Sequence, residues 1–241
     1  MNASHPCYAV VLMESIDRGQ SWQYSSTVTE AGSEATLERL DDGRLMVVTR
    51  YDFGGHIPDL PGPPGAVTPY RQHFSSDMGR SWAYGGEMQG ADGSPPPHSV
   101  MPTLKRTPGG YVLTGGRTGL YLWTCPDTAC IDHGGWTATN IAAHHNAVVG
   151  ATDPLGHYLP NCVNTTDWDV RNSTASGSGS ANTCASSGYI GLAHLGNGTL
   201  LLCYDHASSK VRPEPHGWEV YCVCGQMPAH TYGPHQWQQQ Q

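Results

Sequence analysis

The sequence of 241 residues predicts an all-β protein, and three observations support this prediction. An eight-residue pattern, S-x-D-x-G-x-x-W, occurs without mismatch at residues 15–22 and again at residues 75–82. Short segments of strand-like residues are separated by Asp-Gly, Gly-Gly and Asn-Gly pairs, which favour tight turns between antiparallel strands. The chain also contains 30 Gly and 18 Pro, which suits a fold with many turns.

The repeated pattern has the chemistry of a hairpin turn that is held by its own side chains. Ser and Asp side chains can hydrogen-bond nearby backbone amides. The Gly supplies the positive φ of a tight turn, and the Trp is expected to fold back and bury its ring beneath the loop. The residues assigned to the two turns are Ser15, Asp17, Gly19, Trp22, Ser75, Asp77, Gly79 and Trp82.

The expected strands follow in chain order, mostly as hairpins. They cover residues 8–13 and 23–28, 35–40 and 44–50, 70–75 and 83–88, 100–105 and 111–117, 120–124 and 136–141, 189–195 and 199–204, and 218–224. A degenerate third copy of the turn, which keeps an Asp, a Gly and a Trp, is expected at residues 132–136. Residues 147–187 are expected to form an insertion loop, and the Gln-rich residues 231–241 a disordered tail.

The repeated turn resembles the Asp box, or BNR repeat, of the sialidase (neuraminidase) superfamily. This resemblance implies a six-bladed β-propeller with four-stranded blades. It also implies that each box lies at the turn between the outer two strands, on the face away from any active site. The expected strands make about three and a half to four blades, whereas propellers close with about 4 to 8. We therefore interpret residues 1–230 as a partial sialidase-type propeller that lacks its N-terminal blades.

Four residues carry the resemblance to a sialidase site. The segment 33–50 is similar to the sialidase segment that begins with the catalytic Glu and ends its second strand with an active-site Arg, and Glu34 and Arg50 occupy these positions. Arg117 resembles the next arginine of the family's triad, and Tyr189 opens a segment like that of the nucleophilic Tyr. Other interpretations stay open: a solvated loop Glu, a surface Arg at a strand end, turn chemistry in Gly-Gly-Arg, and a packed Tyr at a strand edge.

The resemblance implies a glycoside hydrolase that removes terminal sialic acids from glycoconjugates with retention. The substrate carries a carboxylate beside its anomeric carbon, so a neutral Tyr suits the reaction better than a charged nucleophile. Tyr189 would attack with Glu34 as its base, while Arg50 and Arg117 would hold the carboxylate. The family's first Arg and its Asp acid/base belong to the earliest blade and have no counterpart here. We therefore expect the chain to be inactive by itself.

A second hypothesis is a non-catalytic Asp-box propeller that binds glycans or proteins. Such domains keep the boxes and lose the site residues. An Arg followed by an Asp in an additional first blade would favour the enzyme. The expected partner is a sialylated glycan or another carbohydrate. No metal or cofactor is expected, because the 13 histidines are scattered without ligand spacing, and the pair at 144–145 is expected in a polar surface loop.

Charge and hydropathy argue against two other classes of function. The formal net charge of −8 provides no basic patch for nucleic acid. The sequence has no apolar run that approaches the roughly 18 residues of a membrane-spanning helix.

Cysteine usage favours a secreted or lumenal glycoprotein. The count of 8 is even, and we expect disulfides between Cys125 and Cys130 and between Cys162 and Cys184. Glycosylation sequons begin at Asn2, Asn164, Asn172 and Asn197. No signal peptide is visible after Met1, and free buried cysteines in a cytosolic protein are the alternative.

Overall fold

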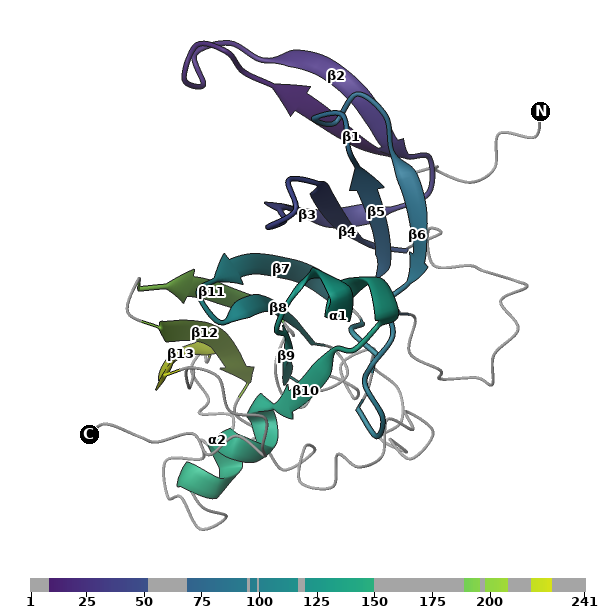
Figure 1. Cartoon of the computed structure of the whole chain (residues 1–241). Coiled ribbons are helices and arrows are strands. Elements are labelled where there is room, and N and C mark those ends of the chain that lie inside the picture. Colours follow the sequence, from purple (N-terminus) through teal and green to yellow (C-terminus); the bar gives the residue numbers. More distant parts are fainter. Residues whose placement is uncertain are drawn as a thin grey trace, which may run out of the picture.

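The computed structural model describes residues 9–51, 69–94, 96–98, 100–116, 120–149, 189–195, 198–207 and 218–226. Within these residues the chain is mostly antiparallel β-sheet, which confirms the predicted class, and it also forms two short helices. Four sheets follow one another in chain order, and each strand pairs with its neighbour in the sequence (Figure 1).

The sheets match the expected hairpins, with small differences at the strand ends. The first sheet contains β1 (Val10–Glu14) and β2 (Gln23–Thr29). The second contains β3 (Ser33–Arg39), β4 (Leu45–Arg50), β5 (Arg71–Ser75) and β6 (Ala83–Glu87). The third contains β7 (Val100–Thr107), β8 (Gly110–Gly116), β9 (Leu120–Cys125) and β10 (Thr137–Asn140). The fourth contains β11 (Ile190–His194), β12 (Thr199–Ala207) and β13 (Trp218–Gln226).

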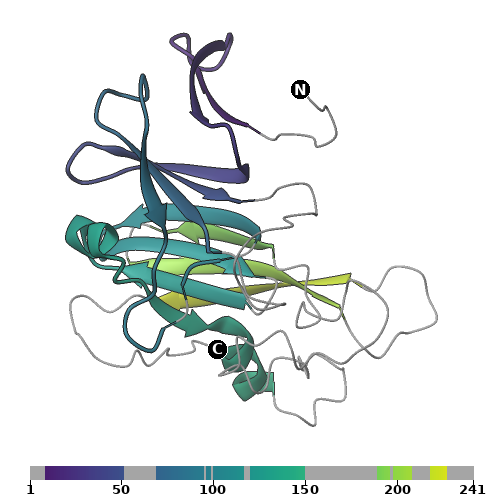
Figure 2. The ribbon, with the colours of Figure 1, turned by 90° about the vertical axis from the view of Figure 1, so that its right-hand side faces the viewer.

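The third sheet is buried on both faces, because its neighbours stack against it on either side (Figure 2). Successive side chains of a strand point to opposite faces. In β9, Tyr121 and Trp123 therefore join the core that contains Met46 and Val48 of the second sheet, whereas Leu122 joins a separate core. That second core holds the apolar side chains of the fourth sheet, namely Ile190, Leu200, Leu202 and Tyr204.

The two S-x-D-x-G-x-x-W turns have the same local structure, as the repeated pattern predicts. In the second turn, the Asp77 carboxylate accepts hydrogen bonds from the Ser75 hydroxyl (2.8 Å), the Ser81 amide (2.9 Å) and the Ser81 hydroxyl (2.6 Å). The Ser75 oxygen accepts a bond from the Gly79 amide at 2.8 Å, and the φ of Gly79 is +86°. The first turn repeats all these bonds at the same distances through Ser15, Asp17, Gly19 and Ser21.

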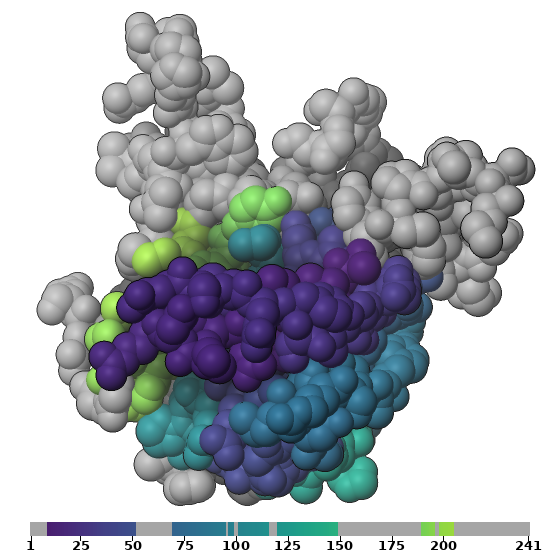
Figure 3. All heavy atoms as spheres, turned by 90° about the horizontal axis from the view of Figure 1, so that it is seen from above, coloured from purple at the N-terminus to yellow at the C-terminus, as the bar shows by residue number. Residues whose placement is uncertain are grey.

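The two tryptophans differ in their surroundings. The indole Nε1 of Trp82 donates to the Ser26 hydroxyl of β2 at 2.9 Å, so the second turn packs against the β1–β2 hairpin. Trp22 donates within its own turn, to the Gly19 carbonyl at 3.2 Å, and it is 62% exposed. The prediction that both rings are buried is therefore wrong for Trp22. The hairpin that carries it lies at the end of the stack, at the surface (Figure 3).

The Asp carboxylates of the two turns make part of the protein's stability depend on pH in the acidic range. Hydrogen bonds from Ser81 and Ser75 lower the pKa of Asp77 from 3.8 to about 2, because they stabilise the ionised carboxylate. The unfolded chain protonates this carboxylate at its ordinary pKa, so the stabilisation is complete at neutral pH and disappears as the pH falls from about 4 to about 2. We expect the melting temperature to fall across this window, and to fall less steeply in Asp77→Asn.

Asp17→Asn is a matched variant, because the same bonds lower the pKa of Asp17 to about 2. Thermal unfolding followed by circular dichroism at several pH values measures both slopes. A slope that is unchanged in both variants would contradict the assignment of the acid sensitivity to the turns.

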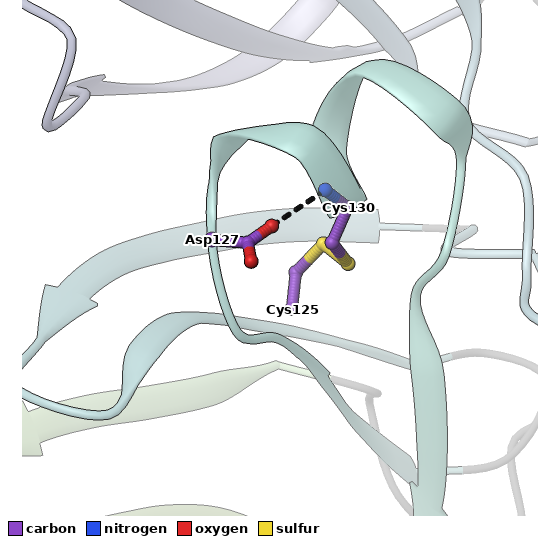
Figure 4. The surroundings of a disulfide bond; sticks show 3 residues. All are labelled: Cys125, Asp127 and Cys130. Carbon is purple, nitrogen blue, oxygen red and sulfur yellow. Dashed lines mark hydrogen bonds between the residues drawn. A yellow bond between two sulfur atoms is a disulfide. The ribbon is translucent and has the colours of Figure 1, made fainter.

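The expected third copy of the turn is a helix instead. Helix α1 (Thr128–His133) begins after Asp127, whose carboxylate accepts the Cys130 amide at 2.8 Å (Figure 4). Gly134 ends the helix with a φ of +72°. Asp132 lies in the helix and binds the Arg44 guanidinium at 3.0 Å rather than closing a turn. A capped turn of helix thus replaces the hairpin turn, because Asp and Gly favour both structures.

The disulfide between Cys125 and Cys130 is confirmed, and it joins the end of β9 to α1 (Figure 4). Cys203 of β12 also takes part in a disulfide. The expected pair Cys162–Cys184, the sequons at Asn2, Asn164, Asn172 and Asn197, and the Gln-rich tail lie outside the described residues. Non-reducing peptide mapping should recover the linked peptides 125–130 and 162–184. Two free thiols at 162 and 184 would contradict the second pair.

Helix α2 (Ile141–Val149) was not predicted from the sequence. It begins after Asn140, whose side-chain oxygen accepts the Ala143 amide at 2.9 Å. His145, expected in a polar surface loop, is buried, and its Nδ1 lies 2.8 Å from the Tyr204 hydroxyl. The expected insertion loop at 147–187 thus begins in helix, and the rest of it lies outside the described residues. Neither helix in the described parts of the chain is long and apolar enough to cross a membrane.

Candidate functional site

Strands β3 and β7, the first strands of neighbouring sheets, lie side by side. Alternate side chains of β3 accept hydrogen bonds from backbone amides of β7: Glu34 from Met101 (2.8 Å), Thr36 from Leu104 (3.2 Å) and Glu38 from Arg106 (3.2 Å). Residues two apart share one face of a strand, so three successive side chains of this face reach the same neighbour. In these three pairs the residue numbers increase along both strands, so β3 and β7 run in the same direction. Their N-terminal ends therefore meet at Glu34.

Glu34 and Arg50 form an ion pair at this end. Strand pairing places Ser33 opposite Arg50, and a bulge between Ser33 and Ala35 turns Glu34 toward the guanidinium. The Arg50 Nη1 donates to Glu34 Oε2 at 3.2 Å, and the same oxygen accepts the Met101 amide. The two side chains are 28% and 22% exposed, so solvent reaches the pair. The structure thus brings together these two sequence-predicted site residues.

Met101 adds an irregular backbone to this end. The backbone φ of Met101 is +47°, a value that residues other than Gly rarely adopt. The register of β7 against β8 also shifts between Val100 and Thr103. The Met101 amide holds Glu34, and its side chain is 45% exposed. Backbone strain of this kind collects at functional sites, where the surrounding structure maintains it.

Tyr70 lies beneath the ion pair and was not predicted as a site residue. Its side chain is fully buried. Burial raises its pKa well above the ordinary value, the negative charge of Glu34 raises it further, and the positive charge of Arg50 opposes both effects. The hydroxyl therefore stays protonated at neutral pH within the field of Glu34 and Arg50. Because solvent does not reach it, Tyr70 does not meet a substrate.

Gly115 of β8 provides the space for the Tyr70 hydroxyl. A Cβ at this position would collide with that hydroxyl and would lie 2.9 Å from the carbonyl oxygen of His98. His98 is buried, and its ring packs edge-on against Trp123 with 5.4 Å between ring centroids. Gly115, Tyr70 and His98 thus form the packed floor of the Glu34 end.

The structure places Tyr189 immediately before β11, with 44% of its side chain exposed. Strand β11 packs against β7 and β8, and the Thr114 hydroxyl donates to the Ile190 carbonyl at 3.4 Å. Tyr189 therefore starts a strand that packs against β7, the strand whose Met101 amide binds Glu34. Arg117 lies outside the described residues and follows Gly116, which pairs with Val100 at the start of β7.

The second turn lies at the opposite end of its sheet from Glu34 and Arg50. Strand pairing places Thr49 opposite Arg71, whereas Ser75, which opens the turn, is opposite Leu45. Strand β4 therefore ends in Arg50 at one end of the sheet, and β5 leads into the turn at the other. No signal in the sequence marks Tyr70, Met101 or Gly115 as parts of the Glu34 end, because each acts through contacts with distant strands.

Comparisons with known proteins give information on the fold only. No family model and no curated protein sequence matches the chain. A protein of unknown function from Dyadobacter fermentans is structurally similar, with a TM-score of 0.50 and 16% identity over 89% of this chain and 44% of its own length. A weaker likeness is to the alpha-L-arabinanase of Penicillium chrysogenum, solved with arabinobiose, with a TM-score of 0.40 and 12% identity over 96% of this chain and 53% of the arabinanase. The chain thus spans about half the length of these two structures.

Proposed function

We propose that the chain is part of a sialidase-like glycoside hydrolase whose site lies at the Glu34 end of β3, β7 and β11. The Glu34–Arg50 ion pair carries this proposal, because it joins the expected base and an expected carboxylate-binding cation at 3.2 Å. Its position away from the second turn agrees with the arrangement that the sialidase resemblance implies. In this proposal the four sheets are successive blades of a six-bladed propeller.

The proposed chemistry follows from the charges of a sialic acid. Arg50 and Arg117 bind the substrate carboxylate, and a guanidinium has five N–H donors, so Arg50 can hold Glu34 and a carboxylate together. The Tyr189 oxygen attacks the anomeric carbon and forms a glycosyl-tyrosine bond, while the phenolic proton passes to Glu34. The aglycone leaves with a proton from a general acid, a role that the sialidase resemblance assigns to no residue of this sequence.

The binding-only hypothesis is favoured by the way Glu34 is already used. Its Oε2 accepts both the Arg50 guanidinium and the Met101 amide, so the carboxylate helps to hold the ends of β3 and β7 together. A protein that only binds an acidic glycan needs such a fixed arginine but needs neither the nucleophile nor the general acid.

A sialyl fluoride separates the two hypotheses. Fluoride leaves without protonation, so attack by Tyr189 on this reagent forms the C–O bond and breaks the C–F bond without a general acid. We expect mass spectrometry of tryptic peptides to find a glycosyl adduct on Tyr189, and no adduct in Tyr189→Phe or Glu34→Gln. Binding of sialic acid without an adduct would support the binding protein, and the absence of both would contradict the whole proposal.

We also expect no turnover of a fluorogenic sialoside by residues 1–241, because the sequence has no counterpart of the family's Asp acid/base. Sialic acid binding, measured by calorimetry, should weaken about tenfold or more in Arg50→Ala, which loses a charge-assisted pair. Arg39→Ala is the control, since Arg39 is an exposed arginine at the far end of the same hairpin. Robust turnover by the chain alone would overturn the claim that an essential acid is absent.

A further inference from the structure

A second group of polar side chains lies on the other face of the second sheet. Thr49 of β4 is directly opposite Arg71 of β5, and the neighbouring pair is Val47 opposite His73. Thr49 and Arg50 are adjacent in β4 and point to opposite faces, so this group is separated from the Glu34 end by the sheet itself.

Three polar atoms of this group are buried and have no hydrogen-bond partner: Thr49 Oγ1, Arg71 Nε and His73 Nε2. The Thr49 side chain is fully buried, and His73 is 4% exposed. A buried donor or acceptor without a partner is destabilising, and natural proteins contain few of them. Thr49 is directly opposite Arg71, and His73 is two residues further along β5 on the same face, so one bound ligand can satisfy all three atoms.

The charge and the surroundings of the group suit an anion. The Arg71 guanidinium lies over the Tyr51 ring, 3.2 Å from its centroid, which helps to hold it in place. Glu87, directly opposite Arg71 in the sheet, forms an ion pair with it at 3.7 Å, a distance too long for a hydrogen bond, so the guanidinium keeps donors for a second anion. Burial, followed by the positive charge of Arg71, lowers the pKa of His73 to about 4, so its ring is neutral at pH 7 and can donate from one nitrogen.

An aromatic surface adjoins these donors. Tyr84 of β6 is opposite His73 in the sheet, their ring centroids are 5.5 Å apart, and the Tyr84 side chain is 58% exposed. The exposed Tyr84 ring thus offers an apolar platform beside the polar side chains of the group. The apolar face of a pyranose ring packs well on such a platform, because aromatic rings contribute a large contact area.

We propose that Arg71, His73 and Thr49 bind the carboxylate of a hexuronic acid, whose sugar ring packs on Tyr84. The carboxylate accepts from the Arg71 edge, from the His73 ring and from the Thr49 hydroxyl, which satisfies all three unpartnered atoms. This site is distinct from the proposed sialic acid site, so either can fail without the other.

Calorimetric titration of the whole chain with three small ligands tests the proposal. Glucuronate carries both the carboxylate and the ring, acetate only the carboxylate, and glucose only the ring. We expect glucuronate to bind, acetate to bind about tenfold more weakly, and glucose to give no signal. Arg71→Met and Thr49→Val should weaken glucuronate binding by about tenfold and about fivefold.

Arg39→Ala is the matched control, because it removes an exposed arginine from the far end of the β3–β4 hairpin, and it should leave glucuronate binding unchanged. Thermal unfolding of each variant identifies any that fails to fold, and Thr49→Val, which removes only a hydroxyl, keeps the test decisive if Arg71→Met unfolds. Absence of glucuronate binding would show that water alone satisfies these atoms and would overturn the proposal. Loss of binding in Arg39→Ala would overturn it as well, since Arg39 lies outside the proposed group.

Discussion

Replacing Gly115 by alanine is expected to destabilise the protein by about 3 kcal/mol, because the new methyl group has no space. The added Cβ collides with the Tyr70 hydroxyl, lies 2.9 Å from the His98 carbonyl oxygen and lies 3.2 Å from the Trp123 ring. All three neighbours are buried, so none can move into solvent. Urea denaturation followed by tryptophan fluorescence measures the loss.

Gly191→Ala is the matched control for this substitution. Gly191 is also inside a strand, but a Cβ there would lie 3.8 Å from its nearest neighbour, which is ordinary contact. Alanine restricts the unfolded chain more than glycine, so we expect a change within about 1 kcal/mol and in the stabilising direction. Equal losses in both variants would show that Gly115 is not held against Tyr70 and His98.

Gly115→Ala should also affect ligand binding at the Glu34 end. Displacement of Tyr70 disturbs the floor below Glu34 and Arg50, so sialic acid binding should weaken in Gly115→Ala even at temperatures where the variant is folded. Binding that is unchanged in the folded variant would mean that Tyr70 does not support the ion pair.

The hairpins were predictable because their signals are local. The bonds among Ser75, Asp77 and Ser81 span only a few residues, and Gly79 supplies its own backbone conformation. The same local logic also misled, since Asp and Gly near residue 132 suit a helix cap as well as a hairpin turn. Helix α2 was missed because residues 136–141 read as a strand, although the Asn140 side chain caps the start of this helix.

The Glu34 end was only partly predictable. Glu34 and Arg50 face each other across one hairpin, so a single strand pair brings them together. Tyr70, Met101 and Gly115 come from other strands and other sheets, and their roles depend on burial, on a positive φ and on a missing side chain. None of these properties can be read from a residue type, because each is set by tertiary packing.

The second prediction with a large effect concerns the two tryptophans. Trp82→Ala is expected to lower the free energy of unfolding by about 3 kcal/mol. This value is at the lower end for removal of a packed Trp, because Trp82 is only half-buried. Its Nε1 donates to Ser26, whose own hydroxyl donates to the Gly79 carbonyl, so removal of the ring leaves a buried hydroxyl with one partner fewer. The β1–β2 hairpin should then detach from the second turn, and its amides should exchange faster with deuterium.

Trp22→Ala removes the equivalent ring from the first turn and should cost less than about 1 kcal/mol, since most of that ring is already in water. The two turns have the same hydrogen bonds, so the difference between the variants isolates the packing of one sheet against the next. Equal losses would place the stabilisation inside the turn. If a further blade covers Trp22 in a longer form of the protein, Trp22→Ala should there become as costly as Trp82→Ala is in this chain.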